Sequence, residues 1–318
     1  RSRGLGDVYK RQRASLSNQS DFSWTLDNLI YYDKEFGKHS VGLTLLQSAT
    51  GYHYEESSMA AEGIPLESAK WNALSKENVS LLDEWNSGLI EKQLLSYMFR
   101  VNYDYNNKYL LTVSGRWDGA SQLAEGNKWA FFPSAALGWR LDQEEFLKDV
   151  TWLNQLKFRL GVGVTGNSAI DPYQTKGAIV SLYYPFGSAL APGYAASEPL
   201  IKDGAVAMAN KNLSWEKTTQ YNIGLDYSVL NGRISGVLDF YTSRTTDLLM
   251  AMTIPSLNGY TNTYANVGKT SNIGVDITLN TVNVKTRDFE WSTSINAAWQ
   301  KDKIDELANG KEDDINNN

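Results

Sequence analysis

Residues 215–249, WEKTTQYNIGLDYSVLNGRISGVLDFYTSRTTDLL, contain two alternating segments joined by Asn231-Gly232. From Tyr221 to Val229 the odd-numbered residues are apolar or aromatic and the even-numbered ones polar or small, which is the two-residue period of a β-strand. Asn-Gly favours a two-residue type I′ turn, because both residues take positive φ, and this turn fixes the register. It predicts the pairs Val229 with Ile234, Tyr227 with Gly236, Leu225 with Leu238 and Ile223 with Phe240. We therefore predict a long hairpin with one apolar and one polar face.

The composition excludes several classes of protein. The chain has 318 residues, 42% hydrophobic and 12% aromatic, a content that excludes wholesale disorder. Its net charge of −6 and pI of about 5.1 provide no basic surface for nucleic acid. It has no cysteine and two histidines, so we expect neither a metal site nor a cofactor. No run of about 18 apolar residues occurs, but membrane-spanning strands would leave only the alternating signal.

The same alternation recurs along the chain, and about ten strands are predicted. They are 21–32, 39–54, 97–105, 109–117, 129–141, 156–165, the two arms of the hairpin, 264–284 and 289–300. We expect long excursions at Glu55–Gly88, with a short helix around 70–85, and at Gly166–Asn212, which contains four prolines. After residue 141 a short helix is predicted, with Asp142 as N-cap and Glu145 at the capping-box position.

Short and long connections alternate, with the short helix in a short position. This order is typical of an antiparallel up-and-down transmembrane β-barrel, with short periplasmic turns, an apolar lipid face and a polar lumen. The predicted fold class is therefore all-β and a partial barrel. The expected lumen-facing residues are Arg100, Asp104, Arg116, Arg140, Lys157, Arg159, Asp226, Asp239 and Asp276. They either solvate the lumen or contact a plug domain, and the residues leave both interpretations open.

Three other site-like features favour no chemistry. Gly161-x-Gly163-x-x-Gly166 matches a phosphate-loop spacing, but no helix pattern follows it, so we interpret two of its glycines, Gly161 and Gly163, as strand residues. His39 and His53 are far apart and have no clustered ligand set, and no nucleophile elbow is present, so no enzyme activity is expected. The acidic residues between Asp302 and Asp314 match no EF-hand spacing and are interpreted as a solvated loop.

Several blocks of the sequence resemble the SusC/RagA family of TonB-dependent outer-membrane transporters. They are SYMFRVNYDYNNKYLLTVSGRWDGAS (96–121), WAFFPSAALGWRLDQEEFLK (129–148), WLNQLKFRLGVGVTGN (152–167), the hairpin stretch 215–249, and NVGKTSNIGVDITLN (266–280). The resemblance implies a barrel of roughly 22 strands around an N-terminal plug. It also implies coupling to the TonB complex through the N-terminal region and a SusD-like surface lipoprotein as partner. We expect residues 13–318 to be part of such a barrel domain, without plug or C-terminal strands, and residues 1–12, RSRGLGDVYKRQ, to be a non-native remnant.

The resemblance implies import of an oligosaccharide or a peptide across the outer membrane of a Gram-negative cell. The two long excursions, Glu55–Gly88 and Gly166–Asn212, would then face outside and meet the ligand or the lipoprotein. Two alternatives remain open at this point: a passive porin or structural barrel, and a soluble β-rich adhesion module.

Overall fold

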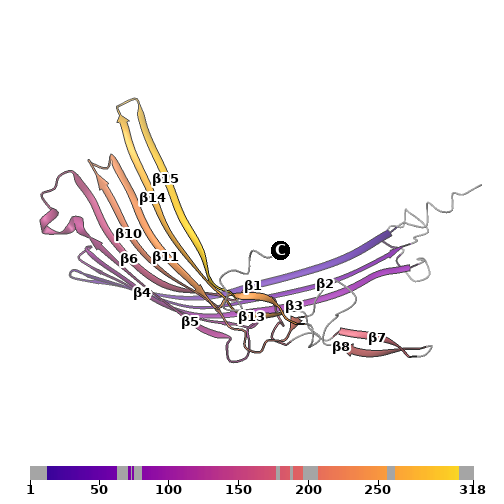
Figure 1. The fold of residues 1–318 in the computed structure, drawn as a ribbon. Helices are drawn as coiled ribbons and strands as arrows, with labels where there is room; N and C mark the ends of the chain where they lie inside the picture. The colour runs from indigo at the N-terminus through magenta and orange to yellow at the C-terminus, as the bar shows by residue number, and fades with distance from the viewer. Residues whose placement is uncertain are drawn as a thin grey trace, which may run out of the picture. The chain divides into compact units, whose positions relative to one another are not determined.

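The computed structural model describes residues 13–62, 71–72, 74, 81–176, 180–186, 189–195, 207–255 and 262–307. Ten strands form one sheet in chain order (Figure 1). They are β1 (Arg13–Phe36), β2 (His39–Glu62), β3 (Leu81–Tyr105), β4 (Tyr109–Ala120), β5 (Trp129–Arg140), β6 (Leu153–Asn167), β10 (Glu216–Val229), β11 (Ile234–Thr246), β14 (Lys269–Lys285) and β15 (Glu290–Glu306). From β3 to β15 each pairs antiparallel with the next. The predicted all-β, up-and-down sheet of about ten strands is confirmed.

Two small sheets are formed by strands in the connections between β6 and β10 and between β11 and β14. One pairs β7 (Val180–Phe186) with β8 (Ala189–Ala195), and the other has the order β12 (Leu249–Thr253), β13 (Asn262–Asn266), β9 (Ala207–Met208). The interpretation of Gly166–Asn212 as a loop is therefore wrong in part. Two prolines of this segment are strand residues in the two-stranded sheet of β7 and β8. Pro185 is the Cα partner of Leu190, and Pro192 is the Cα partner of Tyr183. Proline is tolerated in such edge positions, so it was a poor marker of a loop here.

The chain divides into two compact units, residues 1–26 with 49–93 and residues 27–48 with 94–318. The first unit contains the ends of β1, β2 and β3 that lie farthest from their tight turns. Residues 55–62 and 81–88, which were predicted as loop, are strand in the structure. Of the helix predicted around 70–85, residues 71–72 form a 3-10 turn and 81–85 belong to β3, while 73 and 75–80 lie outside the described residues. The apolar residues of these strand ends, such as Met59-Ala60-Ala61 and Leu81-Leu82, follow one another directly, so the two-residue alternation that reveals a strand is missing.

The register predicted for the Asn231-Gly232 hairpin is confirmed. Val229 pairs with Ile234, Leu225 with Leu238 and Ile223 with Phe240, over arms of 14 and 13 residues. Asn231 and Gly232 have φ of 57° and 78°, as a type I′ turn requires. Leu230 also has positive φ, and its N–H donates to the Trp152 carbonyl at 2.7 Å. The regular ladder therefore stops at Val229 and Ile234. A two-residue turn would have added one more pair, Leu230 with Arg233.

The helix after β5 differs from the prediction. Two single 3-10 turns, η3 (Leu141–Gln143) and η4 (Glu145–Leu147), replace one capped helix, and neither has a side-chain cap. Asp142 instead accepts hydrogen bonds from Nη2 of Arg140 at 2.8 Å and from the backbone N–H of Leu156 at 3.2 Å. The carboxylate thus ties β5 to β6, and the capping-box assignment of Asp142 and Glu145 is wrong. A short polar side chain can satisfy the neighbouring strand as well as a helix terminus.

A small apolar cluster lies where β4 ends and where β5 and β10 begin. Trp215 packs edge-on against Phe132, with ring centroids 5.2 Å apart, and both are almost fully buried with Ala120 and Leu123. The Trp215 indole N–H donates to the Lys128 carbonyl at 2.8 Å. This cluster fixes the start of β10. Among the described residues, no helix has the length and apolarity needed to cross a membrane.

Candidate functional site

A row of paired residues crosses seven strands of the sheet on one face. It consists of Asp104, Leu110, Gly138, Arg159, Gly224, Asp239 and Asp276, each the Cα partner of the next. Residues two positions away in each strand share this face, because side chains alternate. We call it the polar face. All nine charged residues that the sequence predicts for the lumen lie on it, from Arg100 in β3 to Asp276 in β14.

Arg159 is the centre of a charge network on the polar face. Its Nε donates to both carboxylate oxygens of Asp226, at 2.9 and 3.1 Å, and its Nη2 donates to both oxygens of Asp239, at 3.0 and 3.2 Å. Asn222 donates to Asp239 at 3.4 Å. The three charged side chains are 22–31% exposed. A planar guanidinium suits this geometry, because its donors form a rigid fork.

Gly224 makes room for the network. A Cβ atom at Gly224 would lie 2.5 Å from Oδ1 of Asp239 and 2.7 Å from Cζ of Arg159. A side chain there would displace the contact between the guanidinium and the carboxylates. By contrast, a Cβ at Gly161, which is opposite Asn222, would meet only the Asn222 Cβ, at 4.0 Å. The small residue at 224 is therefore tied to the network and the one at 161 is not.

The other six predicted residues lie on the same face but do not join this network. Arg116 forms an ion pair with Asp118 at 2.7 Å, and Arg140 with Asp142 at 2.8 Å. Asp104 accepts the backbone N–H of Asn107 at 2.7 Å and so serves the tight turn after β3. Lys157 is the Cα partner of Asp226, Asp276 is the partner of Asp239, and Arg100 is the partner of Ser114. Within the described part of the chain, none of these last three forms an ion pair.

A groove of about 500 Å³ crosses the polar face beside Arg159. It is lined by residues of β1 to β6 and β10, including Asp33, Asn102, Asp104, Lys157, Arg159 and Asn222. Charged groups of both signs and side-chain amides face the same space. Such a surface can hydrogen-bond a polar ligand or a polar protein segment.

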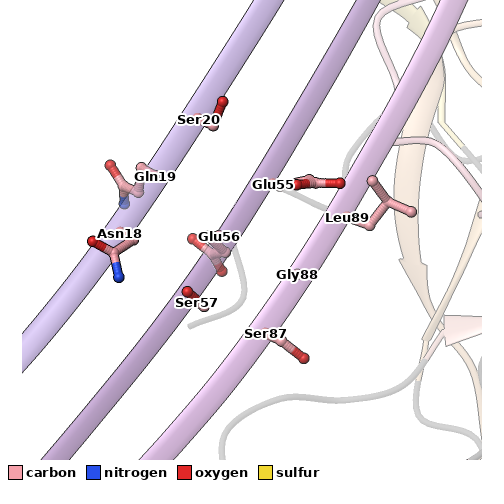
Figure 2. Close-up of a pocket in the computed structure, with 9 residues that line it drawn as sticks. All are labelled: Asn18, Gln19, Ser20, Glu55, Glu56, Ser57, Ser87, Gly88 and Leu89. Atoms are coloured by element: carbon pink, nitrogen blue, oxygen red, sulfur yellow. The ribbon is translucent and has the colours of Figure 1, made fainter.

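A second hollow lies in the first unit, on the ends of β1, β2 and β3 that are farthest from their tight turns (Figure 2). We call these the outer ends of the three strands. It measures about 490 Å³ and is lined by Asn18, Gln19, Ser20, Glu55, Glu56, Ser57, Ser87, Gly88 and Leu89. Figure 2 shows Glu55 reaching from β2 toward β3. Glu56 accepts the Tyr54 hydroxyl at 2.8 Å. All but two of the lining residues carry polar side chains, which gives this hollow a hydrogen-bonding character.

A family model described as "TonB dependent receptor-like, beta-barrel" matches residues 2–318. The chain belongs to this family. It is 38% identical over 255 residues to TonB-dependent receptor SusC of Bacteroides thetaiotaomicron, which covers 77% of this chain and 24% of that protein. It is 34% identical over 298 residues to TonB-dependent receptor P26 of Formosa agariphila, covering 92% of this chain and 29% of the relative. The SusC/RagA-like character expected from the sequence blocks is confirmed.

The solved structures agree with this assignment at the level of the fold. The structure of the RagAB peptide transporter aligns with a TM-score of 0.79 and 24% identity, over 92% of this chain and 31% of that chain. This chain therefore spans between 24% and 31% of the lengths of these relatives. It is part of an outer-membrane protein of a Gram-negative bacterium.

One charged site of the receptor barrel was not recognised in the sequence. Glu144, between η3 and η4, accepts hydrogen bonds from Nζ of Lys108 at 2.7 Å, the Tyr109 hydroxyl at 2.8 Å and Nε1 of Trp139 at 2.9 Å. These bonds, led by the one from Lys108, lower the pKa of Glu144 from 4.5 to about 2. The same contact raises the pKa of Lys108. The sequence signal for this site is the pair of aromatic residues Tyr109 in β4 and Trp139 in β5, whose ring centroids lie 6.4 Å apart in a stacked arrangement.

The remaining site-like residues of the sequence belong to strands or contact neighbouring side chains. Gly161 and Gly163 lie within β6, as predicted, and Gly166, which was predicted to begin the long loop, is also a residue of β6. His39 Nδ1 lies 2.7 Å from the Tyr103 hydroxyl, and His53 lies between Glu55 and Glu91 at 3.1 and 3.0 Å. In the described residues no group of three or more acidic, histidine or cysteine side chains has metal-site geometry. Asp302, Asp305 and Glu306 are residues of β15, so the interpretation of the acidic segment as a loop is wrong for this part, and its residues from 308 to 314 lie outside the described residues.

Proposed function

We propose that the full-length protein imports a bulky nutrient, an oligosaccharide or a peptide, across the outer membrane by gated binding without covalent chemistry. The observation that carries the proposal is a ten-stranded, up-and-down sheet of a TonB-dependent receptor, with a charged face opposite an apolar one. The relatives are receptors and transporters, which supports transport rather than catalysis.

In this proposal the polar face lines the lumen and the apolar face meets lipid. The alternation predicted for membrane barrels supports this orientation, because lipid-facing and lumen-facing residues alternate along each strand. The Arg159 network would then stiffen the lumen wall, while Arg100, Lys157 and Asp276 offer charges to a plug domain or to a passing ligand. No nucleic acid has a role, since the chain is acidic.

We further propose that a SusD-like lipoprotein covers the extracellular side and that the TonB complex provides energy through a region outside this chain. The likeness to SusC and to the RagAB peptide transporter supports this assembly. The polar hollow on the outer ends of β1 to β3 is a hydrogen-bonding surface suited to the ligand or the lipoprotein.

Uptake by a strain that lacks the gene tests this function. Labelled oligosaccharides and peptides are offered to the deletion strain and to strains that regain the wild-type gene, each with and without a protonophore. Energy-dependent uptake that returns with the gene supports the transporter. Uptake that is insensitive to the protonophore would identify a passive porin instead, and unchanged uptake of every ligand in the deletion strain would contradict import.

A further inference from the structure

Two side-chain amides lie on the apolar face. Asn28 of β1 donates from Nδ2 to Oε1 of Gln47 on β2 at 2.6 Å. Both line a hollow of about 600 Å³ whose other walls are mainly aromatic and aliphatic. The aromatic walls are Tyr97, Phe99, Trp117 and Phe131, and all four rings are exposed. A polar pair is thus embedded in the face that meets lipid in the orientation proposed above, on which this inference rests.

Gly115 gives the hollow its depth. A Cβ atom there would lie 2.6 Å from Cζ of Phe131 and 2.6 Å from Cε1 of Phe99. The two rings therefore lie over a position where no side chain rises from the sheet. The result is an apolar depression beside the amide pair, of the size range of small-molecule sites.

The depth of the amides in the membrane follows from the strand. Asn28 lies nine residues before Gly37, in the tight turn between β1 and β2. At about 3.3 Å per residue and a tilt of about 40°, this distance corresponds to roughly 20–25 Å along the barrel axis. The apolar band of such barrels is about 25 Å tall, so the amides lie near its outer edge. There the acyl chains of the outer leaflet join their headgroups.

The amide pair leaves hydrogen-bonding capacity unused. A primary amide has two N–H donors and a carbonyl acceptor. The bond between Asn28 and Gln47 uses one N–H of Asn28 and the carbonyl of Gln47. In the described part of the chain, the Gln47 NH₂ and the Asn28 carbonyl have no partner. Unsatisfied polar groups are strongly unfavourable in hydrocarbon, so a lipid group is needed to pair with them.

We propose that this hollow binds an outer-leaflet lipid with an amide-linked, hydroxylated acyl chain. The chain occupies the depression over Gly115. The lipid amide or hydroxyl donates to Asn28 Oδ1 and accepts from Gln47 Nε2. Phosphatidylcholine, which has ester-linked chains and no N–H or O–H group, can accept from Gln47 but cannot donate to Asn28. The site therefore discriminates by a donor, independently of which nutrient the barrel transports.

Native mass spectrometry of the full-length protein with equimolar lipid A and phosphatidylcholine tests the proposal. Lipid A carries amide-linked hydroxyacyl chains, whereas phosphatidylcholine has ester-linked chains and a quaternary ammonium, and so has no N–H or O–H donor. One net hydrogen bond corresponds to about a fivefold shift in the ratio of bound lipids. Asn28→Leu combined with Gln47→Leu is expected to lower the ratio of bound lipid A to bound phosphatidylcholine by at least about fivefold.

Asn280→Leu is the matched control, since Asn280 is an exposed amide on the polar face, paired with Ser235. It is expected to keep the wild-type ratio. Gly115→Leu fills the depression and is expected to lower binding of both lipids, with heat-modifiable gel mobility as the check that the barrel has folded. An unchanged ratio in the double leucine variant, or an equal loss in Asn280→Leu, would overturn the proposal.

Discussion

The indole Nε1 of Trp139 donates to the carboxylate of Glu144 at 2.9 Å, and this bond folds the connection after β5 back onto the strand that it leaves. The same carboxylate reaches Lys108 in the turn between β3 and β4. Two neighbouring tight connections are therefore held by one acidic side chain. The connection between β5 and β6 stays ordered without a regular α-helix.

This relationship predicts a pH-dependent connection. The pKa of Glu144 is lowered from 4.5 to about 2, so its stabilising contribution is complete above about pH 4.5 and is lost as the pH falls toward 2. Hydrogen exchange over residues 141–152, corrected for intrinsic rates, is expected to show protection that falls in this window. Glu144→Gln is expected to reduce protection at neutral pH and to remove the dependence.

Glu145→Gln is the matched control for this prediction. Glu145 has a 90% exposed side chain, and among the described residues its side chain pairs only with Lys148, at 3.4 Å. It is expected to behave as wild type. A pH profile in Glu144→Gln that matches the wild type would show that another group titrates.

The glycines of the polar face are predicted to differ in tolerance. Gly224→Ala places a Cβ 2.5 Å from Asp239 Oδ1 and is expected to destabilise the barrel by about 1–3 kcal/mol, since the network must shift. Gly161→Ala, whose nearest neighbour is 4.0 Å away, is expected to be neutral or stabilising by less than about 1 kcal/mol. Denaturant unfolding of the full-length protein in lipid vesicles measures both. Equal losses at the two positions would contradict the assigned role of Gly224.

The two cations of β6, Arg159 and Lys157, are predicted to contribute different amounts to the free energy of unfolding. Arg159→Met leaves Asp226 and Asp239 without their shared donor and is expected to lower the free energy of unfolding by about 2–3 kcal/mol. Lys157→Met removes a cation that forms no ion pair within the described residues, and a loss below about 1 kcal/mol is expected. The same unfolding assay separates them, and a larger loss for Lys157→Met would refute the network as described.

Adjacent residues of β11 provide a test of the two faces at one depth. Leu238 is exposed on the apolar face, and Val237 is the Cα partner of Asp226 on the polar face. Leu238→Arg is expected to destabilise the barrel by about 2–4 kcal/mol near the membrane midplane, because lipid cannot solvate the charge. Val237→Arg is expected to be mild. Vesicle unfolding that shows similar losses for both would reverse the assignment of faces.

The sequence was sufficient where turn chemistry and alternation agree. Asn231-Gly232 fixed a register that holds over 13 pairs, and the same alternation identified the face shared by Arg159 and Asp239. Alternation assigns a face, but it does not identify partners. The meeting of Arg159 with two aspartates depends on the pairing of β6 with β10 and of β10 with β11, which the residues of one strand do not encode.

Prediction failed where a strand lacked alternation or where a polar side chain had more than one possible partner. The ends of β2 and β3 farthest from their tight turns contain runs of apolar residues, such as Met59-Ala60-Ala61 and Leu81-Leu82, and were interpreted as loop. Asp142 and Glu144 match a helix start in sequence, but they satisfy β6 and the turn before β4 instead. Local hydrogen-bonding preference was overridden by partners that are distant along the chain.

In the proposed orientation the apolar face meets lipid and the polar face meets water. Single cysteines at each position from Tyr221 to Val229, introduced into an otherwise cysteine-free full-length protein in lipid vesicles, carry a spin label for accessibility measurements. We expect high accessibility to oxygen at odd positions and high accessibility to a water-soluble nickel complex at even positions, with a period of two residues. Uniform accessibility along the segment, or the opposite alternation, would exclude this orientation.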